Sequence, residues 1–350
     1  MTARPRRTPD RWVADDRIGW RVLLTARAAV ALDRAALDGR LQSLHARQGW
    51  PDAPPVVEDD DTARLRAALV SAHPAPLRVG LGAPTGTGGR DLVLSAHHGA
   101  ADGLALLQVL DALGTGPVTS TARGVEDRPT GPGLARTVAG RLAEVAVRPP
   151  ARVTTPRRGA GGVGDVLVER EVTGRHRTAD LVHAAAQGVV AHEAAHGRRA
   201  RRVAVAVGAG RPARPGVVAD RSALIRLRDV ERLDRADVAR LVRTAPLQVP
   251  PTGTAERPWT PYADRAMALG LRLLAPRLGS TVLVSHLGEV TAPAVQHLAF
   301  HPVTAGGTGI SLGAVGLAAR DQTVLTLRAR ADRWTDDGLE QLLEAVISLL

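Results

Sequence analysis

The spacing of apolar and polar positions predicts alternating strands and helices in the first half of the chain. An apolar run over 18–32 indicates a strand, and leucines recurring every three to five residues over 32–48 indicate a helix. A second helix is expected at about 62–72. The strands "LRVGL" and "DLVLSAHH" follow, joined by the glycine-rich turn "GAPTGTGGR", and "DGLALLQVLDAL" then predicts a further helix.

The second half repeats this mixture of elements. "GDVLVEREV" and "RRVAVAVGAG" predict strands, and the segment between them predicts a helix with Thr178 as its N-cap. "LDRADVARLVRTA" and a stretch near 263–275 are expected to be helical, and "STVLVSHLG" to be a strand ending in a turn. A hairpin with its turn near 319–322 precedes a final helix capped by Thr335. The predicted class is therefore α/β or α+β with mixed sheets.

The stretch from Gly114 to Gly164 is rich in Gly, Pro, Thr and Arg, with one helix expected near 134–146. We interpret it as the connection between an amino-terminal lobe, 1–150, and a carboxy-terminal lobe, 151–350. The string "GAGGVG" within it resembles a dinucleotide-binding loop, but it precedes a strand instead of following one, which favours a linker.

Composition excludes several classes of site. The 350 residues include no cysteine, so disulfides, thiolate metal sites and a cysteine nucleophile are ruled out. All 46 basic residues are arginine, and the net charge is +11. Arginine suits a phosphorylated ligand or an acidic partner protein. The basic residues are scattered and not interleaved with aromatics, so a nucleic-acid partner is not expected.

The amino-terminal Arg6–Arg7 pair is typical of a twin-arginine signal, but "VADDRIGW" follows it where such a signal has an apolar segment. No apolar run approaches the length of a membrane span, so we expect no integral membrane association. A cytoplasmic protein is the default expectation.

Two adjacent histidines and an aspartate mark the joint at 97–103, "HHGAADG". Because side chains alternate along a strand, His97 and His98 are expected to point in different directions. Asp102 lies where the next helix begins, a good N-cap position, and Gly103 follows it. Each residue alone has a structural explanation. Together they place ionisable groups at the end of a buried strand, where open α/β sheets often hold their sites.

"HHGAADG" matches the HHxxxDG motif, and the chain thereby resembles the CoA-dependent acyltransferase superfamily. This superfamily includes chloramphenicol acetyltransferase, the condensation domains of nonribosomal peptide synthetases, plant acyltransferases and polyketide-associated acyltransferases of actinobacteria. The resemblance extends to the early helix "ALDRAALDGRL", the strand "VAVAVGAGR", the turn "SHLG" and the closing hairpin and helix. This layout covers most of the chain.

The resemblance implies two chloramphenicol-acetyltransferase-like lobes, each a mixed sheet with flanking helices, and an active-site channel between them. It implies an acyltransferase, active in secondary metabolism or lipid biosynthesis, in which His98 is the general base. His98 would take a proton from a hydroxyl or amine acceptor that attacks the thioester of an acyl-CoA or acyl carrier protein. Imidazole suits this task because it changes protonation near neutral pH. Coenzyme A or phosphopantetheine would enter as co-substrate, with no permanently bound cofactor and no metal.

The resemblance also assigns supporting residues. His97 and Asp102 would shape the turn, Arg211 would pair with Asp102, and Gly103 would leave room for the reactants. The substrate channel would be lined by Gly99, Ser285, His286 and Gly288.

The sequence departs from the family pattern in three places. His286 stands where Asn is usual, which puts its channel-lining role in doubt. Only His45 and Arg47 match an Arg-His segment that relatives often carry, and the chain is compact for the family.

Two alternatives compete with acyl transfer. The string "HEAAH" places His192 and His196 one helical turn apart with Glu193 between them, the pattern of a zinc hydrolase. Against it, Gly197 is expected to end the helix, and no third ligand is evident. The second alternative is a non-catalytic condensation-like adaptor that binds a carrier protein, against which the intact motif argues. A Ser285–His286 hydrolase is disfavoured because no G-x-S-x-G turn is present.

Overall fold

The structure is a computed structural model that describes residues 20–84, 89–122, 124–125, 128, 131, 140, 143–144, 147–155, 162, 164–211, 216–248, 279–304 and 309–350. The expected helix near 263–275 lies outside these residues, and the one near 134–146 lies largely outside them, as does the Arg6–Arg7 pair.

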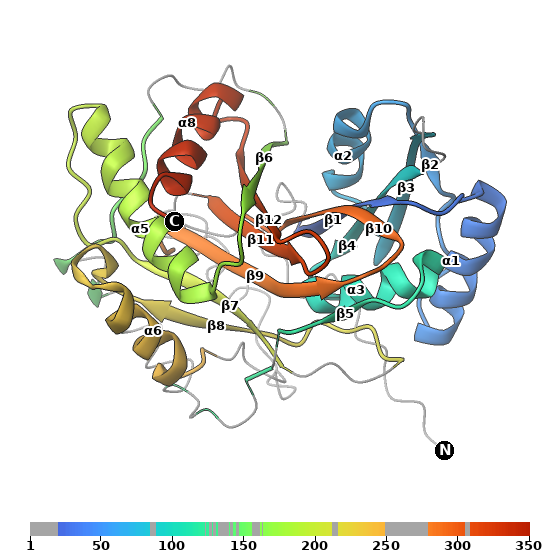
Figure 1. Cartoon of the computed structure of the whole chain (residues 1–350), viewed down its shortest axis with the longest axis horizontal. Helices are drawn as coiled ribbons and strands as arrows, with labels where there is room; N and C mark the ends of the chain where they lie inside the picture. Colours follow the sequence, from blue (N-terminus) through green and yellow to red (C-terminus); the bar gives the residue numbers. More distant parts are fainter. Residues whose placement is uncertain are drawn as a thin grey trace, which may run out of the picture.

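Two mixed sheets, each with its own helices, lie side by side (Figure 1). The first has the strand order β10-β1-β4-β3-β2. Its strands are β1 (Arg21–Ala28), β2 (Val57–Glu58), β3 (Leu77–Pro84), β4 (Arg90–His97) and β10 (Val295–His301). Neighbouring strands are antiparallel except for the parallel pair β2 and β3.

Helices cover both faces of the first sheet. They are α1 (Arg34–Gln48), α2 (Thr62–Val70) and α3 (Gly103–Leu110), which runs on into a π-helical turn at Asp111–Thr115. Alternation along β4 sends Val93 towards α2 and Leu94 into the opposite core, to which α1 and α3 contribute. Both side chains are fully buried, so this strand is covered on both sides, and the expectation of a buried strand before the histidine pair is confirmed.

The second sheet has the order β6-β12-β11-β9-β7-β8, with the short β5 beside β9. Its strands are β5 (Thr119–Ser120), β6 (Asp165–Thr173), β7 (Val205–Gly210), β8 (Ser222–Leu227), β9 (Val282–Thr291), β11 (Ile310–Leu317) and β12 (Gln322–Arg330). The helices α5 (Thr178–Ala195) and α8 (Asp336–Ile347) pack on it, α6 (Arg235–Thr244) packs against α5 and β8, and a short 3₁₀ turn spans Val230–Arg232. Parallel pairs (β7–β9, β9–β11) and antiparallel pairs coexist, which confirms the mixed α/β prediction.

Strand β10 joins the first sheet although it comes late in the chain. It pairs with β1 in register from Leu23 opposite His301 to Ala28 opposite Val295. The chain therefore leaves the second sheet after β9, adds one strand to the first sheet and returns for β11 and β12. A division of the chain into two lobes near residue 150 stays a prediction. The crossover shows that β10, from the second half of the chain, belongs to the first sheet.

Two predicted local features are wrong. The N-cap of α5 is Arg177 instead of Thr178, because the Asp180 carboxylate accepts the Arg177 N–H at 3.2 Å and so closes the first turn one residue earlier. The "SHLG" segment does not end its strand. A bulge at Gly288, with φ of 75°, lets β9 continue to Thr291.

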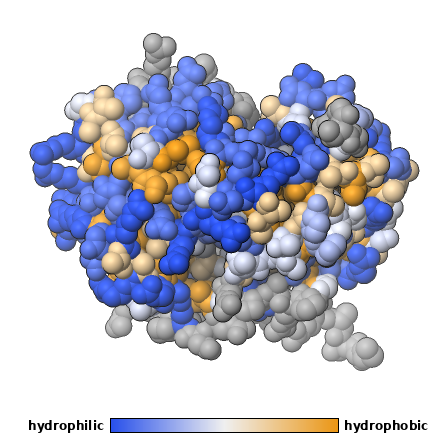
Figure 2. Space-filling view, viewed as in Figure 1, coloured by the Kyte–Doolittle hydropathy of each residue, from blue (hydrophilic) through white to orange (hydrophobic). Residues whose placement is uncertain are grey.

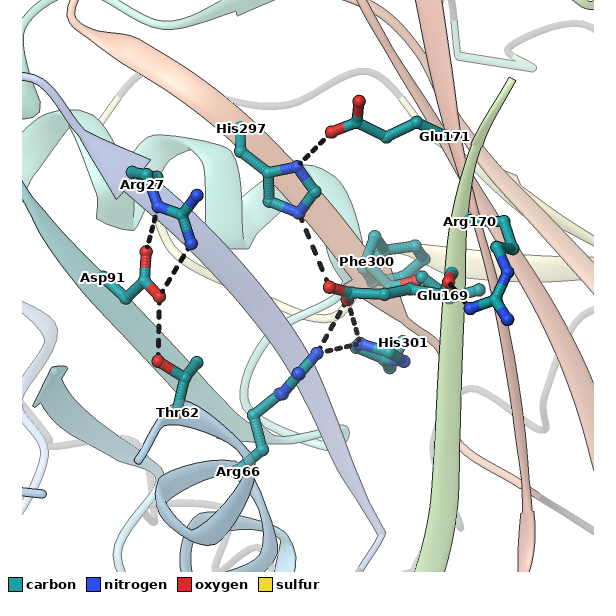
Figure 3. Close-up of polar contacts among 11 residues, drawn as sticks. Arg27, Thr62, Arg66, Asp91, Glu169, Arg170, Glu171, His297, Phe300 and His301 are labelled. Carbon is teal, nitrogen blue, oxygen red and sulfur yellow. Dashed lines mark hydrogen bonds and ion pairs between the residues drawn. The ribbon is translucent and has the colours of Figure 1, made fainter. Parts of the chain in front are cut away.

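Polar side chains from α2, β6 and β10 connect the two lobes (Figure 3). Arg66 on α2 donates to Glu169 on β6 at 2.7 Å, and Glu169 also lies 3.7 Å from Nε2 of the fully buried His301 on β10. His297 approaches Glu169 at 3.8 Å and meets Glu171 at 2.9 Å. We call these five residues the interlobe polar cluster.

Burial and the neighbouring charges together shift the pKa values of His301 and Glu169 in this cluster. Burial lowers the pKa of His301 to about 4, and the Arg66 charge adds to the effect, although Glu169 opposes it. Burial alone would raise the pKa of Glu169, but His301 and Arg66 outweigh it and lower that pKa to about 2. At neutral pH the cluster therefore holds a carboxylate against an arginine and a neutral imidazole.

Hydrophilic side chains cover most of the face seen in Figure 2, with apolar residues showing between them. Within the described ranges, the exposed large apolar side chains are Val147, Val217 and Leu224. No helix in this part of the chain is both long and apolar enough to cross a membrane.

Candidate active site

The joint after β4 is a tight turn fixed by backbone hydrogen bonds. The N–H of His98 donates to the Trp20 carbonyl at 2.7 Å, and the Ala100 and Ala101 N–H groups donate to the His97 carbonyl at 2.8 and 3.2 Å. The turn lifts His98 out of the apolar strand, in which every residue from Leu92 to Ala96 is buried.

His98 is partly exposed, with 30% of its side chain accessible. Its Nδ1 is buried and has no hydrogen-bond partner, so the Nε2 edge of the ring is the part free to meet a ligand. Asp220 lies behind the ring, with Oδ1 3.8 Å from Nδ1. A carboxylate in this place favours the tautomer with the proton on Nδ1, which leaves the lone pair of Nε2 available to accept a proton.

Asp220 was not predicted as a site residue. The same Oδ1 accepts the Ser222 N–H at 2.9 Å and the Ser222 hydroxyl at 2.5 Å, so the carboxylate is held in place beside the imidazole. It comes from the segment before β8, in the other lobe. No local pattern around Asp220 distinguishes it from an ordinary turn aspartate, which explains why sequence reasoning missed it.

His97 and Asp102 hold the turn in position. His97 Nδ1 accepts the Gly99 N–H at 3.1 Å. Asp102 caps α3 through Oδ1, which accepts the Ala105 N–H at 2.9 Å, and its Oδ2 accepts the Arg221 N–H from the other lobe at 2.9 Å. Burial raises the pKa of Asp102, although both hydrogen bonds oppose this change.

The partner of Asp102 differs from the expected one, and Gly103 takes part in packing. Among the described residues, no ion pair joins Asp102 to Arg211, and the backbone of Arg221 takes that place instead. Arg211 lies on the cavity wall. A side chain at Gly103 would meet Leu287 at 2.6 Å and Phe300 at 2.7 Å, so this glycine allows close packing of β9 and β10. Gly103 also lines the cavity between the two lobes, and its role in leaving room for the reactants stays a prediction.

A cavity of about 1600 Å³ lies between the lobes and reaches His98. Gly99 and Asp102 line it from the first lobe, and Ser285, His286 and Gly288 line it from β9. The predicted channel residues are thus brought together with His98 around one cavity. Its size falls above the usual range for small-molecule sites, about 300–1000 Å³, and suits a long ligand.

Among the described residues, six arginines line this cavity: Arg128, Arg175, Arg177, Arg211, Arg221 and Arg226. Arg226 is bound by both oxygens of Glu144, at 2.7 and 2.8 Å. Arg128 donates to the Val242 carbonyl. Arg211 and Arg221 have no side-chain hydrogen bond or ion pair within the described part of the chain, so their guanidinium groups remain available to an anionic ligand.

The histidines of the zinc-hydrolase pattern are committed to helix packing. His192 is 3% exposed and packs near Trp334, and His196 turns back so that its Nδ1 lies 2.7 Å from the His192 carbonyl. Glu193 is buried and accepts the Thr154 N–H at 2.9 Å, which occupies the carboxylate that would serve as base. The described residues contain no group of three or more His, Cys, Asp or Glu able to hold a metal ion. As predicted, the helix ends before Gly197, which has φ of 70°.

No family model and no curated protein matches the sequence. Solved structures do match, and condensation domains are among them. The first condensation domain of the calcium-dependent antibiotic synthetase, in complex with substrate analogue 2a, is 16% identical, with 95% of this chain and 90% of that chain covered and a TM-score of 0.54. A variant of the starter condensation domain of rhizomide synthetase RzmA, in complex with C8-CoA and Leu-SNAC, is 13% identical, with coverages of 97% and 90% and a TM-score of 0.57.

A third match is the condensation domain from Monacolin K polyketide synthase MokA, 12% identical, with 94% of this chain and 91% of that chain covered and a TM-score of 0.50. These likenesses define the class of fold: it is the two-lobed fold of condensation domains. The fold expected from the resemblance is therefore confirmed.

Proposed function

We propose that this chain is an acyltransferase that moves an acyl group from a CoA or carrier-protein thioester to a hydroxyl or amine. Nε2 of His98 takes the proton from the acceptor as its oxygen or nitrogen attacks the thioester carbonyl carbon. The new bond forms a tetrahedral intermediate, the carbon–sulfur bond then breaks, and the leaving thiolate takes the proton from the imidazolium. Atoms and charges balance without any further reactant.

The observation that carries this proposal is the position of His98. Its ring is partly exposed on the wall of the interlobe cavity, while its buried Nδ1 faces the Asp220 carboxylate. A sealed histidine surrounded by aliphatic side chains would have contradicted it. The Asp220 charge stabilises the imidazolium that forms when the acceptor loses its proton.

The arginines support a phosphorylated donor. Arg211 and Arg221 border the cavity with guanidinium groups that no described side chain engages, and arginine forks suit phosphate oxygens. One solved domain of the same fold, the RzmA starter domain, is in complex with C8-CoA, which makes octanoyl-CoA a suitable first donor. Because the solved relatives belong to synthetases, we place the reaction in secondary metabolism.

The test measures release of free CoA from octanoyl-CoA in the presence of a panel of alcohols and amines. His98→Ala is expected to lower acceptor-dependent release by about 10²- to 10⁴-fold. His196→Ala is the matched control, because His196 lies at the end of α5 away from the cavity, and its rate is expected to stay at the wild-type level.

Each contrary outcome would reject a different part of the proposal. Full activity in His98→Ala removes His98 as the base. Loss of activity in His196→Ala would restore the zinc-hydrolase alternative. Binding of a carrier protein without turnover of any thioester would favour the adaptor.

A further inference from the structure

A second group of polar side chains lines the same cavity on the side of β9. These residues are His176, which precedes α5, and His286 and Glu289 on β9, and we call them the histidine–glutamate wall. Each carries a buried atom with no hydrogen-bond partner: Nε2 of His176, Nε2 of His286 and Oε2 of Glu289. Buried polar atoms in folded proteins are rarely left unpaired, so three on one wall call for an explanation.

The bulge in β9 brings two of these residues to the same face. Against β11, His286 lies opposite Ala314 and Glu289 lies opposite Gly316, so three steps on β9 match two on β11. Simple alternation would send residues three apart to opposite faces. The extra residue restores them to one face, and such bulges often re-aim side chains next to sites.

The surrounding backbone makes room for the Glu289 carboxylate. A side chain at Gly316 would overlap that carboxylate, so the glycine is required for its placement. β7 pairs with β9 only as far as Ser285, and β5 pairs with it from Val290 onwards. Between these pairings no further strand ladder is formed on that edge in the described structure. The Thr121 N–H donates to the Glu289 carbonyl and the Thr121 hydroxyl accepts the Glu289 N–H, at 2.9 Å each, and the segment borders the cavity.

His286 presents an acceptor to this space. Burial lowers its pKa to about 4, with a further contribution from His176, so the ring is neutral near pH 7. Its Nδ1 lies 3.2 Å from the Thr178 hydroxyl. When Nδ1–H donates to that hydroxyl, the lone pair of Nε2 is left without a donor.

Glu289 is the cavity carboxylate that lacks hydrogen bonds. The three acidic residues among the described cavity residues are Asp102, Asp220 and Glu289, and the first two accept hydrogen bonds from Arg221 and Ser222. Among the described residues, the ion-pair partner of Glu289 Oε2 is the exposed Arg175, at 3.8 Å, and Arg175 is shared with Asp321 at 3.6 Å. Two carboxylates thus face one guanidinium.

The protonation of Glu289 reflects this shortage of donors. Burial raises its pKa and Asp321 adds to the rise, while Arg175 and His176 only partly offset it. A ligand cation that donates hydrogen bonds would stabilise the ionised form and would fill the unpaired acceptors. A protonated amine has both properties.

Building on the proposed acyl transfer, we propose that the histidine–glutamate wall binds a protonated amine of the acceptor substrate, distinct from the atom acylated at His98. The acceptor class is then a molecule with two polar ends: a nucleophilic hydroxyl or amine, and an ammonium group held by Glu289 with His286 and His176.

Calorimetric titration of the full-length protein with a series of α,ω-diaminoalkanes and the matching α,ω-alkanediols tests this subsite without any thioester. At least one diamine is expected to bind about tenfold more tightly than its diol, the size of one charge-assisted hydrogen bond. Glu289→Gln is expected to abolish this preference. Gly316→Ala, which displaces the carboxylate without removing it, is expected to reduce it.

Asp321→Asn is the matched control. It removes the same charge beside Arg175 but lies outside the cavity lining, and its positive φ of 47° suits asparagine. The diamine preference should survive in this variant. Equal loss in Asp321→Asn, an unchanged preference in Glu289→Gln, or no preference in the wild type would each overturn the subsite.

The two proposals fail separately. His98→Ala is expected to stop acyl transfer and to keep the Glu289-dependent preference for the diamine. Diamine binding without transfer in the wild type would therefore reject the proposed reaction and keep the subsite. Acyl transfer without a Glu289-dependent preference for the diamine would reject the subsite and keep the proposed reaction.

Discussion

The contact between His98 and Asp220 gives the most direct test of the catalytic geometry. Asp220 Oδ1 lies 3.8 Å from the buried Nδ1 of His98, and Ser222 holds the carboxylate through two hydrogen bonds. Asp220→Asn keeps the shape of the side chain and one oxygen for Ser222, but it removes the charge. The variant therefore isolates electrostatic stabilisation of the imidazolium from packing.

The distance sets the expected magnitude. Two unit charges about 4 Å apart interact by about 1 kcal/mol in bulk water and about 4 kcal/mol at an effective dielectric constant of about 20. His98 and Asp220 are 30% and 29% exposed, so solvent screening keeps the interaction near the lower figure, about 1 kcal/mol. If this stabilisation acts in the transition state, kcat falls roughly fivefold.

The assay combines kinetics with ¹⁵N NMR of the histidine rings. In wild-type protein the His98 signals are expected to show the proton on Nδ1, and Asp220→Asn is expected to weaken that tautomer preference. Acceptor KM should change less than kcat, because the charge acts on the imidazolium and not on bound substrate. A kcat within twofold of wild type, together with an unchanged tautomer, would refute the reasoning; the NMR measurement alone tests the geometry if turnover is absent.

Three further predictions concern the framework. Gly103→Ala brings a methyl group against Leu287 and Phe300, so the free energy of unfolding in urea should fall by about 1–3 kcal/mol; an unchanged value would show that β9 and β10 yield easily. Asp165→Asn breaks the buried ion pair in which Arg328 Nη2 lies 2.6 Å from Asp165 Oδ2. The free energy of unfolding should fall by about 3–5 kcal/mol in the same measurement, and a loss under 1 kcal/mol would contradict this prediction. Burial lowers the pKa of His301 from 6.5 to about 4, so between these pH values the unfolded state binds a proton that the folded state does not. The free energy of unfolding should therefore fall by up to about 3 kcal/mol as the pH falls from 6.5 to 4. His301→Gln should flatten the pH dependence of the urea midpoint, and an equal slope in both proteins would exclude His301 as its source.

Elements with strong local signals could be predicted from the sequence. The hairpin of β11 and β12 turns at 318–321, close to the expected 319–322, because polar residues interrupt two apolar alternations. The last helix begins after Thr335, whose hydroxyl accepts the Gly338 N–H. The joint at 97–103 likewise combines an apolar strand, two histidines and a capping aspartate within a few residues.

Features that depend on distant partners could not be predicted. No local pattern marks the segment "VQHLAFH" as a strand. It becomes β10 because β1 offers an edge for pairing. The two-residue strands β2 and β5 are too short for any periodicity. Asp220 meets His98 only through the packing of the lobes, and the wrong choice of Arg211 as partner for Asp102 has the same origin, since Arg221 reaches it through a backbone N–H that any residue type supplies.

Asp102 shows why structural and functional explanations of the motif do not exclude each other. Its Oδ1 caps α3, as an ordinary N-cap aspartate does, and its Oδ2 fastens the segment that carries Asp220 by binding the next residue, Arg221. The same carboxylate therefore fixes the start of the helix beside His98 and the distance from His98 to its counter-ion. A spacing of four residues between His98 and Asp102 meets both needs, because it covers one turn of backbone and ends at the helix N-terminus facing the other lobe. Conversely, the position of the proposed base depends on contacts between the lobes as much as on the turn that bears it.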